Sequence, residues 1–190
     1  MSAKQKNVGV DLGLSDEEKR TLLSLARTVI ANKARREPKP PFPAATEKLR
    51  EHRGAFVYIY KQGMLRGCIG SLEGSTPLME TVEAMAEAAA FRDPRFRPVA
   101  PEELPYLEVE ISALTPLEEI KDPEEIEVGK HGIMIRKGYY SGLLLPQVAT
   151  ERGWDRITFL QETCRKAGLP RNAWQEKDAK IYIFSADVFS

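Results

Sequence analysis

Apolar and polar residues alternate along the chain with periods that change from helix-like to strand-like. Between Asp16 and Arg36, apolar residues recur every three to four positions, the spacing of a helix with one buried face. Ser15, with Glu18 three positions later, is typical of a capping box, in which each side chain accepts the other residue's backbone N–H. We therefore predict a first helix over 16–36. Prolines at 38, 40, 41 and 43 end this helix and stiffen the next segment as an extended connector.

Two pairs of strand-like segments are joined by short turn sequences. AFVYIY (55–60) and MLRGCIGS (64–71) flank a Gly-bearing connection, which is typical of a β-hairpin. GIMIRKGYYSGLLL (132–145) predicts a second hairpin, with turn chemistry from Lys137 to Gly142. Strands that come mainly as hairpins favour an antiparallel sheet with flanking helices, an α+β fold, over a parallel sheet.

The rest of the pattern completes the expected organisation. We predict further helices at 47–52, 146–153, 155–167 and from Thr76 onward, and strands at 107–114 and 179–186. Irregular connections are expected at 91–104 and 117–130, and the second of them could contain one helical turn. We expect a single domain over 15–190, with two lobes and a cleft between them, after a flexible N-terminal segment 1–14. The acidic stretch 122–127 is one candidate for the boundary between two subdomains.

The charge balance narrows the classes of function. Lys plus Arg equals Asp plus Glu, 28 against 28, so the formal net charge is zero at pH 7. This balance argues against a protein held on nucleic acid by bulk charge, because counterion release needs a concentrated basic surface. The chain has no run of about 18 apolar residues and no apolar signal-peptide core near its beginning. We therefore expect a cytoplasmic protein without a membrane segment.

The few cysteines and histidines leave little room for a metal site. A zinc site would need Cys68, Cys164, His52 and His131 together, at spacings that match no zinc-finger pattern, so we expect none. Both cysteines are expected to be reduced thiols in the cytosol. The chain also lacks a Gly-x-Ser-x-Gly elbow and a Walker-type phosphate loop, which argues against an α/β-hydrolase and a nucleoside triphosphatase.

LRGCIG, residues 65–70, places a thiol beside an arginine on a predicted strand. Successive strand residues point to opposite faces, so Arg66 and Cys68 share one face, while Leu65 and Ile69 form a core pair on the other. A guanidinium close to a thiol favours the reactive thiolate, which makes Cys68 a candidate catalytic nucleophile. Two alternatives stay open for Cys68. It could line a site without acting as a nucleophile, or it could serve packing, since free cysteine is often buried.

Several neighbours of Cys68 are candidate binding residues. Gly67 and Gly70 would let a ligand or a partner backbone approach the main chain closely, with Ser71 or Glu73 helping to bind it. The same glycines are also expected where a bulge occurs or where a helix lies close against the strand.

Further candidates lie elsewhere in the chain. His131 is the better of the two histidines for a catalytic base, and a solvated turn histidine is the alternative. In RDPRFRP, Asp93 and Arg95 could hold an anionic ligand or one strand of nucleic acid. We favour a simpler interpretation, in which the neighbouring phenylalanines anchor in the core and Asp93 forms a salt bridge or a cap. Gln147 lies near a predicted helix N-terminus, where anions bind readily.

Five separated motifs carry a family resemblance. LRGCIGSLEG, DPRF, EISAL, GLLLPQVA and ERGWDRITFLQETCRKAGLPRNAW occur in this order over about Ser15 to Phe189. They resemble the AMMECR domain family, the protein A component of the AmmeMemoRadiSam system, whose signature falls on Leu65 to Gly70 without departure. The resemblance implies a two-lobed α+β domain associated with a Memo-like protein and a radical SAM protein. It leaves the reaction open and any cofactor unknown.

These observations lead to one functional hypothesis and two alternatives. The chain is expected to bind a small molecule or a modified residue in the cleft between its lobes, lined by Arg66, Cys68 and the DPRF and LLPQ segments, and to act with the Memo-like and radical SAM partners. Whether it is an enzyme stays open. The first alternative is a non-catalytic interaction module that docks through an exposed Trp154 or Trp174. The second is nucleic-acid binding, against which the charge balance argues.

Overall fold

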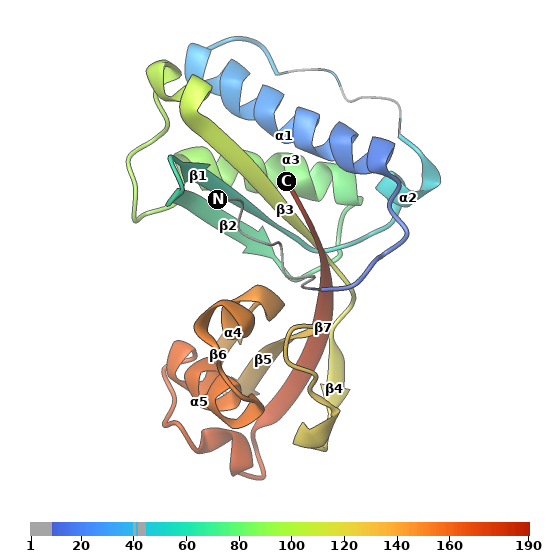
Figure 1. Ribbon diagram of the computed structural model, residues 1–190, viewed down its shortest axis with the longest axis vertical. Helices are drawn as coiled ribbons and strands as arrows, with labels where there is room; N and C mark the ends of the chain where they lie inside the picture. The colour runs from blue at the N-terminus through green and yellow to red at the C-terminus, as the bar shows by residue number, and fades with distance from the viewer. Residues whose placement is uncertain (1–8, 40, 42–44) are drawn as a thin grey trace. The chain divides into compact units, whose positions relative to one another are not determined.

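The computed structural model describes residues 9–39, 41 and 45–190, and the chain divides into two units (Figure 1). The first unit contains Leu12–Pro116 together with Asp187–Ser190. The second unit contains Leu117–Ala186 and residues 9–11. The division falls between Pro116 and Leu117, before the acidic stretch that we considered as a boundary. Each unit has its own hydrophobic core.

Helix α1 of the first unit spans Asp16–Arg35, within one residue of the prediction. Its capping box is formed, because the Ser15 N–H donates to Glu18 Oε2 at 2.8 Å and the Glu18 N–H donates to Ser15 Oγ at 3.2 Å. Arg36 ends the helix in the left-handed conformation, with φ +60°. Of the predicted proline-rich connector, residues 40 and 42–44 lie outside the described residues, as do residues 1–8 of the predicted N-terminal segment.

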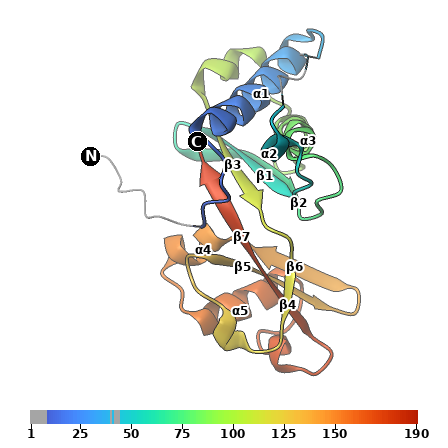
Figure 2. The same ribbon diagram turned by 90° about the vertical axis from the view of Figure 1, so that its right-hand side faces the viewer.

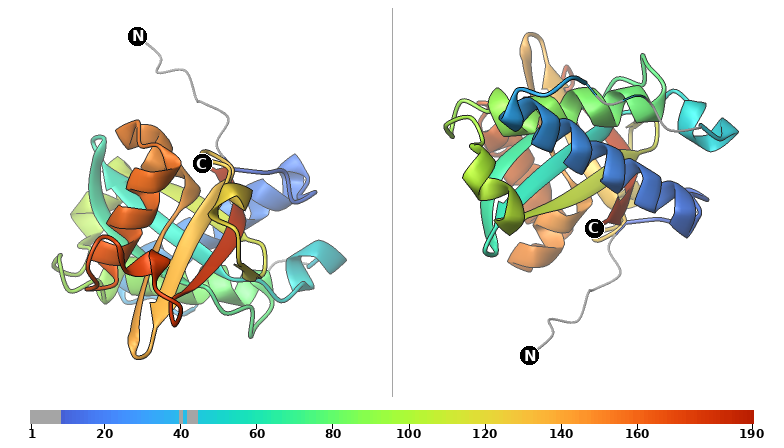
Figure 3. Two further views of the ribbon diagram at one scale, coloured as in Figure 1. Left: turned by 90° about the horizontal axis from the view of Figure 1, so that it is seen from below. Right: turned by 90° about the horizontal axis from the view of Figure 1, so that it is seen from above.

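The sheet of the first unit is antiparallel and begins with the predicted hairpin. Strands β1 (Ala55–Lys61), β2 (Met64–Ser71) and β3 (Leu107–Leu114) lie in the order β2-β1-β3, followed by β7 (Lys180–Phe189). Helices α1 and α3 (Leu78–Phe91) lie side by side against the same face of this sheet (Figure 3, right). The core of the unit fills the space between these helices and the strands. The short helix α2 (Glu47–Arg50) and the 3-10 helix η1 (Pro101–Tyr106) complete the unit.

A β-bulge in β2 overturns one prediction about side-chain orientation. Ile59 pairs with Gly67, but the next residue of β1, Tyr60, pairs with Leu65, which leaves Arg66 as the extra residue. A bulge reverses the alternation of faces along a strand. Leu65 is therefore 38% exposed instead of forming a core pair with Ile69, whereas Ile69 packs against the core as predicted.

The second unit is also an antiparallel sheet with helices. Its strands β4 (Glu118–Ile120), β5 (His131–Lys137) and β6 (Tyr140–Leu144) combine with β7 in the order β4-β7-β5-β6. Helices α4 (Pro146–Arg152) and α5 (Arg156–Lys166) follow β6, and α5 packs against β5 and β6 (Figure 2; Figure 3, left). Two 3-10 helices, η2 (Pro123–Glu125) and η3 (Ala173–Gln175), lie in the connections.

The α+β class and the antiparallel sheet are confirmed, with differences in detail. The predicted irregular segments at 91–104 and 117–130 contain parts of η1, β4 and η2, because short 3-10 turns and a three-residue strand leave no periodic signal. Residues 9–12 of the N-terminal segment are held by hydrogen bonds, such as that from Val10 N–H to the Ala186 carbonyl at 2.9 Å. In the described part of the chain, no helix is both long and apolar enough to cross a membrane.

Trp154 and Trp174 do not form the exposed patch that the interaction-module alternative required. Both side chains are half-buried and pack against the core of the second unit. The exposed aromatic residues of this unit are instead Tyr139 and Tyr140, at the turn between β5 and β6. Among the residues that the structure describes, no three His, Cys, Asp or Glu side chains are grouped as metal ligands.

Candidate functional site

Cys68 lies in the middle of β2, the edge strand of the first unit's sheet. An edge strand presents unpaired backbone N–H and C=O groups to its surroundings. At Cys68 both groups are occupied from the loop after α3. The Cys68 N–H donates to Asp93 Oδ2 at 2.9 Å, and its carbonyl accepts from Arg95 Nη2 at 3.2 Å. The DPRF loop therefore covers the sheet edge at the cysteine.

Asp93 and Arg95 hold each other in a fork. Arg95 donates from Nε to Asp93 Oδ1 at 2.9 Å and from Nη2 to Oδ2 at 2.7 Å, and its backbone N–H also reaches Oδ1 at 3.1 Å. These bonds from Arg95, with that from the Cys68 N–H, hold the pKa of the buried Asp93 carboxyl well below its ordinary value. The Arg95 side chain is 55% exposed, so its guanidinium also faces solvent.

Arg66, the bulged residue of β2, is fixed by a second bidentate pair. Its Nε donates to Glu103 Oε1 at 3.0 Å and its Nη2 donates to Oε2 at 2.9 Å. Lys61 also donates to Glu103 Oε1, at 3.0 Å. The Arg66 guanidinium is the largest cause that lowers the pKa of Glu103 from 4.5 to about 2. The Arg66 side chain is only 14% exposed, so this charge pair is largely desolvated.

One nitrogen of Arg66 lacks an acceptor. Nη1 is buried and forms no hydrogen bond with any part of the chain that the structure describes. A buried donor without an acceptor costs about 1–3 kcal/mol, more when the group is charged. The fork geometry fixes where Nη1 points, because Nε and Nη2 are already bound to Glu103.

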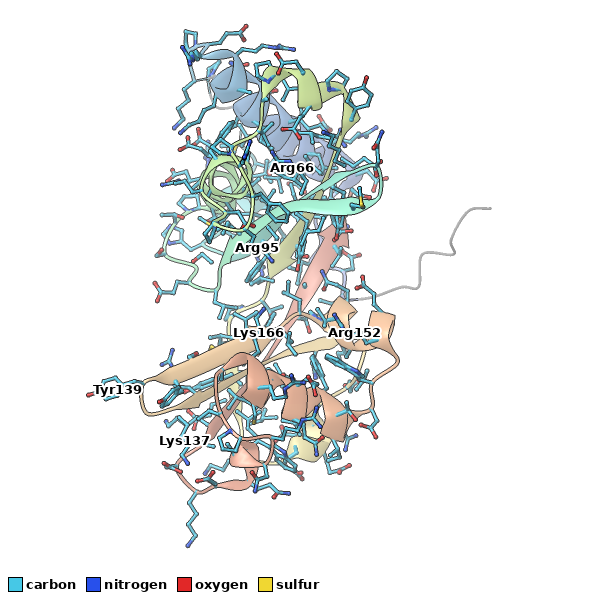
Figure 4. The ribbon with its side chains drawn as sticks, turned by 90° about the vertical axis from the view of Figure 1, so that its left-hand side faces the viewer. Arg66, Arg95, Lys137, Tyr139, Arg152 and Lys166 are labelled. Atoms are coloured by element: carbon cyan, nitrogen blue, oxygen red, sulfur yellow. The ribbon has the colours of Figure 1, made fainter. Side chains whose placement is uncertain are left out.

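Arg66 and Arg95 come together around one aromatic ring. The guanidinium carbon of Arg66 lies 5.9 Å from the centre of the Phe96 ring, and that of Arg95 lies 5.5 Å from it. Figure 4 shows the two arginines in the same region of the first unit. Phe96 is half-buried and joins neither core, whereas Phe91 packs against the first unit's core. Of the two phenylalanines, only Phe91, the last residue of α3, is thus the expected core anchor.

The thiol of Cys68 is half-buried and has a tyrosine and an arginine for neighbours. Tyr58 is its cross-strand partner. Burial above all, and then the nearby Cys68, raises the pKa of the Tyr58 hydroxyl, so this group keeps its proton at neutral pH. The pKa of Arg95 is raised mainly by Asp93, with a smaller contribution from Cys68. Arg95 therefore provides the neighbouring cation, where the strand pattern had predicted Arg66.

At the two glycines near Cys68, neighbouring groups occupy the space that a side chain would need. A Cβ atom at Gly67 would lie 2.2 Å from the Ala89 carbonyl oxygen of α3, so this glycine allows the helix to approach β2. A Cβ atom at Gly70 would lie 2.2 Å from the ring of Phe56, its cross-strand partner. Of the two interpretations that we left open, close packing accounts for both positions.

The other predicted residues are divided between the two units. Ser71 Oγ accepts the Glu73 N–H at 3.3 Å in a local turn, and Glu73 is exposed. His131 and Gln147 belong to the second unit. Burial is the main cause that lowers the pKa of His131, and its Nδ1 accepts the Glu127 N–H at 3.2 Å, so the neutral ring carries its proton on Nε2. Gln147 is buried in the first turn of α4.

Sequence reasoning missed Tyr58, Lys61 and Glu103. The pairing of Tyr58 with Cys68 follows from the hairpin register, but the bulge at Arg66 conceals that register in the sequence. Glu103 lies 37 positions from Arg66 on a 3-10 turn, and no local pattern connects the two residues.

Comparison with known proteins identifies the family of this chain. A family model described as AMMECR1 matches residues 23–189. The chain belongs to the AMMECR1 family. A relative from Methanothermobacter thermautotrophicus is 44% identical over 183 residues, covering 93% of this chain and 95% of that protein. A relative from Aquifex aeolicus is 43% identical over 178 residues, covering 90% of this chain and 91% of the relative.

A crystal structure of an AMMECR1-family homologue supports the fold. The protein PH0010 from Pyrococcus horikoshii, described as uncharacterized, matches with a TM-score of 0.87 and 41% sequence identity, over 92% of both chains. Membership in the AMMECR1 family therefore fixes the α+β architecture. The names of these relatives state no activity, so a function has to be argued from the cluster around Arg66 and Cys68.

Proposed function

We propose that this chain is a cytoplasmic domain that binds the anionic group of a small molecule or of a modified residue at Arg66, Cys68 and Arg95. The observation that carries the proposal is the buried Nη1 of Arg66, which has no acceptor in the described part of the chain. A carboxylate or phosphate oxygen placed there would complete the guanidinium's hydrogen bonds.

The charges of the cluster favour an anion. Three cations, Lys61, Arg66 and Arg95, face two carboxylates, Asp93 and Glu103, which leaves one net positive charge. The carboxylates bind the arginines from one side and fix the directions of their remaining N–H groups. Such preorganisation reduces the entropy lost on binding. Phe96, in contact with both guanidiniums, provides an apolar surface for the rest of the ligand.

The alkylation rate of the Cys68 thiol can be used to measure what binds at the site. Its thiol is half-buried and lies next to the Arg95 guanidinium. In the proposed site the sulfur contacts the bound group. Cys164, by contrast, is fully buried in the second unit, and burial raises the pKa of its thiol. The two cysteines therefore allow an internal comparison.

Competition between two alkylating reagents tests the anion site. Iodoacetate carries a carboxylate and iodoacetamide is its neutral analogue, so the ratio of their rates at Cys68 measures attraction of an anion. We expect this ratio to be about tenfold higher in the folded chain than in urea, equivalent to about 1.4 kcal/mol. Added salt should lower the ratio, since the site faces solvent through Arg95. Peptide mass spectrometry gives the rates at Cys68 and Cys164 separately.

Matched arginine variants show whether the cluster is responsible. Arg66→Gln and Arg95→Gln should each lower the iodoacetate preference severalfold. Arg97→Gln removes an exposed charge from the same loop and should leave the preference unchanged. A folded chain whose Cys68 reacts only in urea, or whose rate ratio equals that in urea, would overturn the proposal.

The proposal includes partners, and the resemblance to the protein A component of the AmmeMemoRadiSam system supports them. In this part of the proposal the chain acts together with a Memo-like protein and a radical SAM protein. Size-exclusion chromatography of the chain mixed with the Memo-like and radical SAM proteins of the same genome tests it. We expect co-elution and slower alkylation of Cys68 in the complex. Separate elution of all three proteins, with unchanged alkylation, would contradict the partnership.

A further inference from the structure

The first unit contains an apolar cavity that does not include any residue of the Arg66–Cys68 cluster. It has a volume of about 300 Å³ and lies between α1, η1 and β3. Ile30 and Ala31 of α1 line one side, and Leu104, Leu107 and Val109 line the other. Arg27 and Arg35 also line it. We propose that this cavity binds a medium-chain carboxylate, with its apolar chain inside and its carboxylate on the arginines.

The spacing of α1 creates the cavity. Arg27, Ala31 and Arg35 are separated by four residues each, so they lie along one face of the helix. The small side chain of Ala31 leaves room between the two arginines, whose Cα atoms are about 12 Å apart along the helix axis. Ile30 on the helix and Leu104, Leu107 and Val109 opposite it make the lining mainly apolar.

The two arginines at the cavity are not paired with carboxylates of the described residues. The guanidiniums of Arg27 and Arg35 form no ion pair or hydrogen bond with any described residue. Lys33, on the same helix, pairs with Glu87 at 2.6 Å, and Lys39 pairs with Glu83 at 2.8 Å. Both arginines are exposed at their own positions. Two unpaired guanidiniums beside an apolar interior are complementary to a molecule that is anionic at one end and apolar at the other.

The chemistry of the cavity selects the class of ligand. A polar group placed against this mainly apolar lining would lose part of its hydrogen bonding to water, which is unfavourable. A hydrocarbon chain loses nothing there and gains about 0.8 kcal/mol for each buried CH₂ group. The volume is at the lower end of that of small-molecule sites and suits a ligand of about ten non-hydrogen atoms. Octanoate has this size and is the probe for the test.

Titration of the whole chain with octanoate, followed by calorimetry and by methyl NMR signals, tests the proposal. We expect saturable binding of one octanoate, with the largest shifts at Ile30, Leu104 and Leu107. The double variant Arg27→Gln/Arg35→Gln should weaken binding at least about tenfold. Octanol, which lacks the charge, and acetate, which lacks the chain, should each bind at least about tenfold more weakly than octanoate.

Two further variants locate the site. Lys33→Gln removes one charge from the same helix away from the cavity and should leave octanoate affinity unchanged. Ala31→Phe fills the cavity and should abolish binding, and its circular dichroism shows whether it folds. The proposal is overturned if octanoate does not saturate, or if the double arginine variant binds octanoate as well as the unaltered chain. The Cys68 alkylation ratio is measured separately, so failure at the cavity does not affect the proposed function.

Discussion

At the scale of single residues, the candidate site depends on two bidentate ion pairs between an arginine and a carboxylate. Asp93 holds Arg95, and Glu103 holds Arg66. Neither pairing creates a net charge, but each fixes a guanidinium that would otherwise sample many rotamers. In the resulting cluster the direction of one donor, Nη1 of Arg66, is fixed. This donor has no acceptor in the described part of the chain.

The pKa of Glu103 makes its contribution to stability depend on pH. Its folded-state pKa is lowered from 4.5 to about 2, so the stabilisation is complete above pH 4.5 and is lost as the pH falls towards 2. The shift corresponds to at most about 3 kcal/mol. Glu103→Gln should therefore be less stable than the unaltered chain at pH 7, and the difference should shrink steadily below pH 4.5. Urea unfolding at a series of pH values measures it.

A matched change nearby separates the ion pair from the general effect of acid. Glu102 is exposed and lies next to Glu103 on η1, so Glu102→Gln should change stability little at any of these pH values. If the Glu103→Gln difference stayed constant from pH 7 to pH 2, the fork with Arg66 would not stabilise the fold.

At the scale of elements, β2 contacts two neighbours, helix α3 and the DPRF loop. On one face it carries Gly67, against which the backbone of α3 packs. At its free edge, the DPRF loop binds the backbone of Cys68. Close packing of the helix thus requires glycine next to the cysteine. The 3-10 helix η1 likewise has two roles, because Glu103 binds Arg66 while Leu104 lines the apolar cavity beside α1.

The close approach of α3 predicts that replacing Gly67 lowers the free energy of unfolding more than replacing Gly70. Gly67→Ala would place its Cβ against the Ala89 backbone oxygen, which cannot move without the helix, and should cost about 1–3 kcal/mol of unfolding free energy. Gly70→Ala meets the half-buried side chain of Phe56, which can move by rotation about χ1 without displacing any backbone, and should cost less. Urea unfolding midpoints compare the two variants. Equal losses would mean that β2 and α3 are not in backbone contact.

At the scale of the whole molecule, two units each combine an antiparallel sheet with helices. The chain leaves the first unit at Pro116 and returns to it through the last residues of β7. This return explains why the closing strand extends to Phe189, beyond the predicted end at 186. The family motifs are shared between the units, with LRGCIG, DPRF and EISAL in the first and the remaining two in the second.

The sequence by itself determined the elements with strong local signals. The capping box at Ser15, the hairpin at 55–71 and the helical stripes each depend on contacts within a few residues, so their periodicity is visible in the chain. The same is true of the family resemblance, since its motifs are contiguous. The class α+β followed from these elements.

Tertiary structure alone decided the surroundings of Cys68. The pairing of Arg66 with Glu103 and the placement of Arg95 at the Cys68 carbonyl join residues that are distant in the chain, and the bulge at Arg66 leaves no mark in the strand pattern. The strand pattern predicted Arg66 beside the thiol because it assumed unbroken alternation. Long-range packing selects one set of partners among many residues of the same type, and no local pattern records that selection. The physical reason is that these contacts form only when strands, helix ends and loops are brought together by the core.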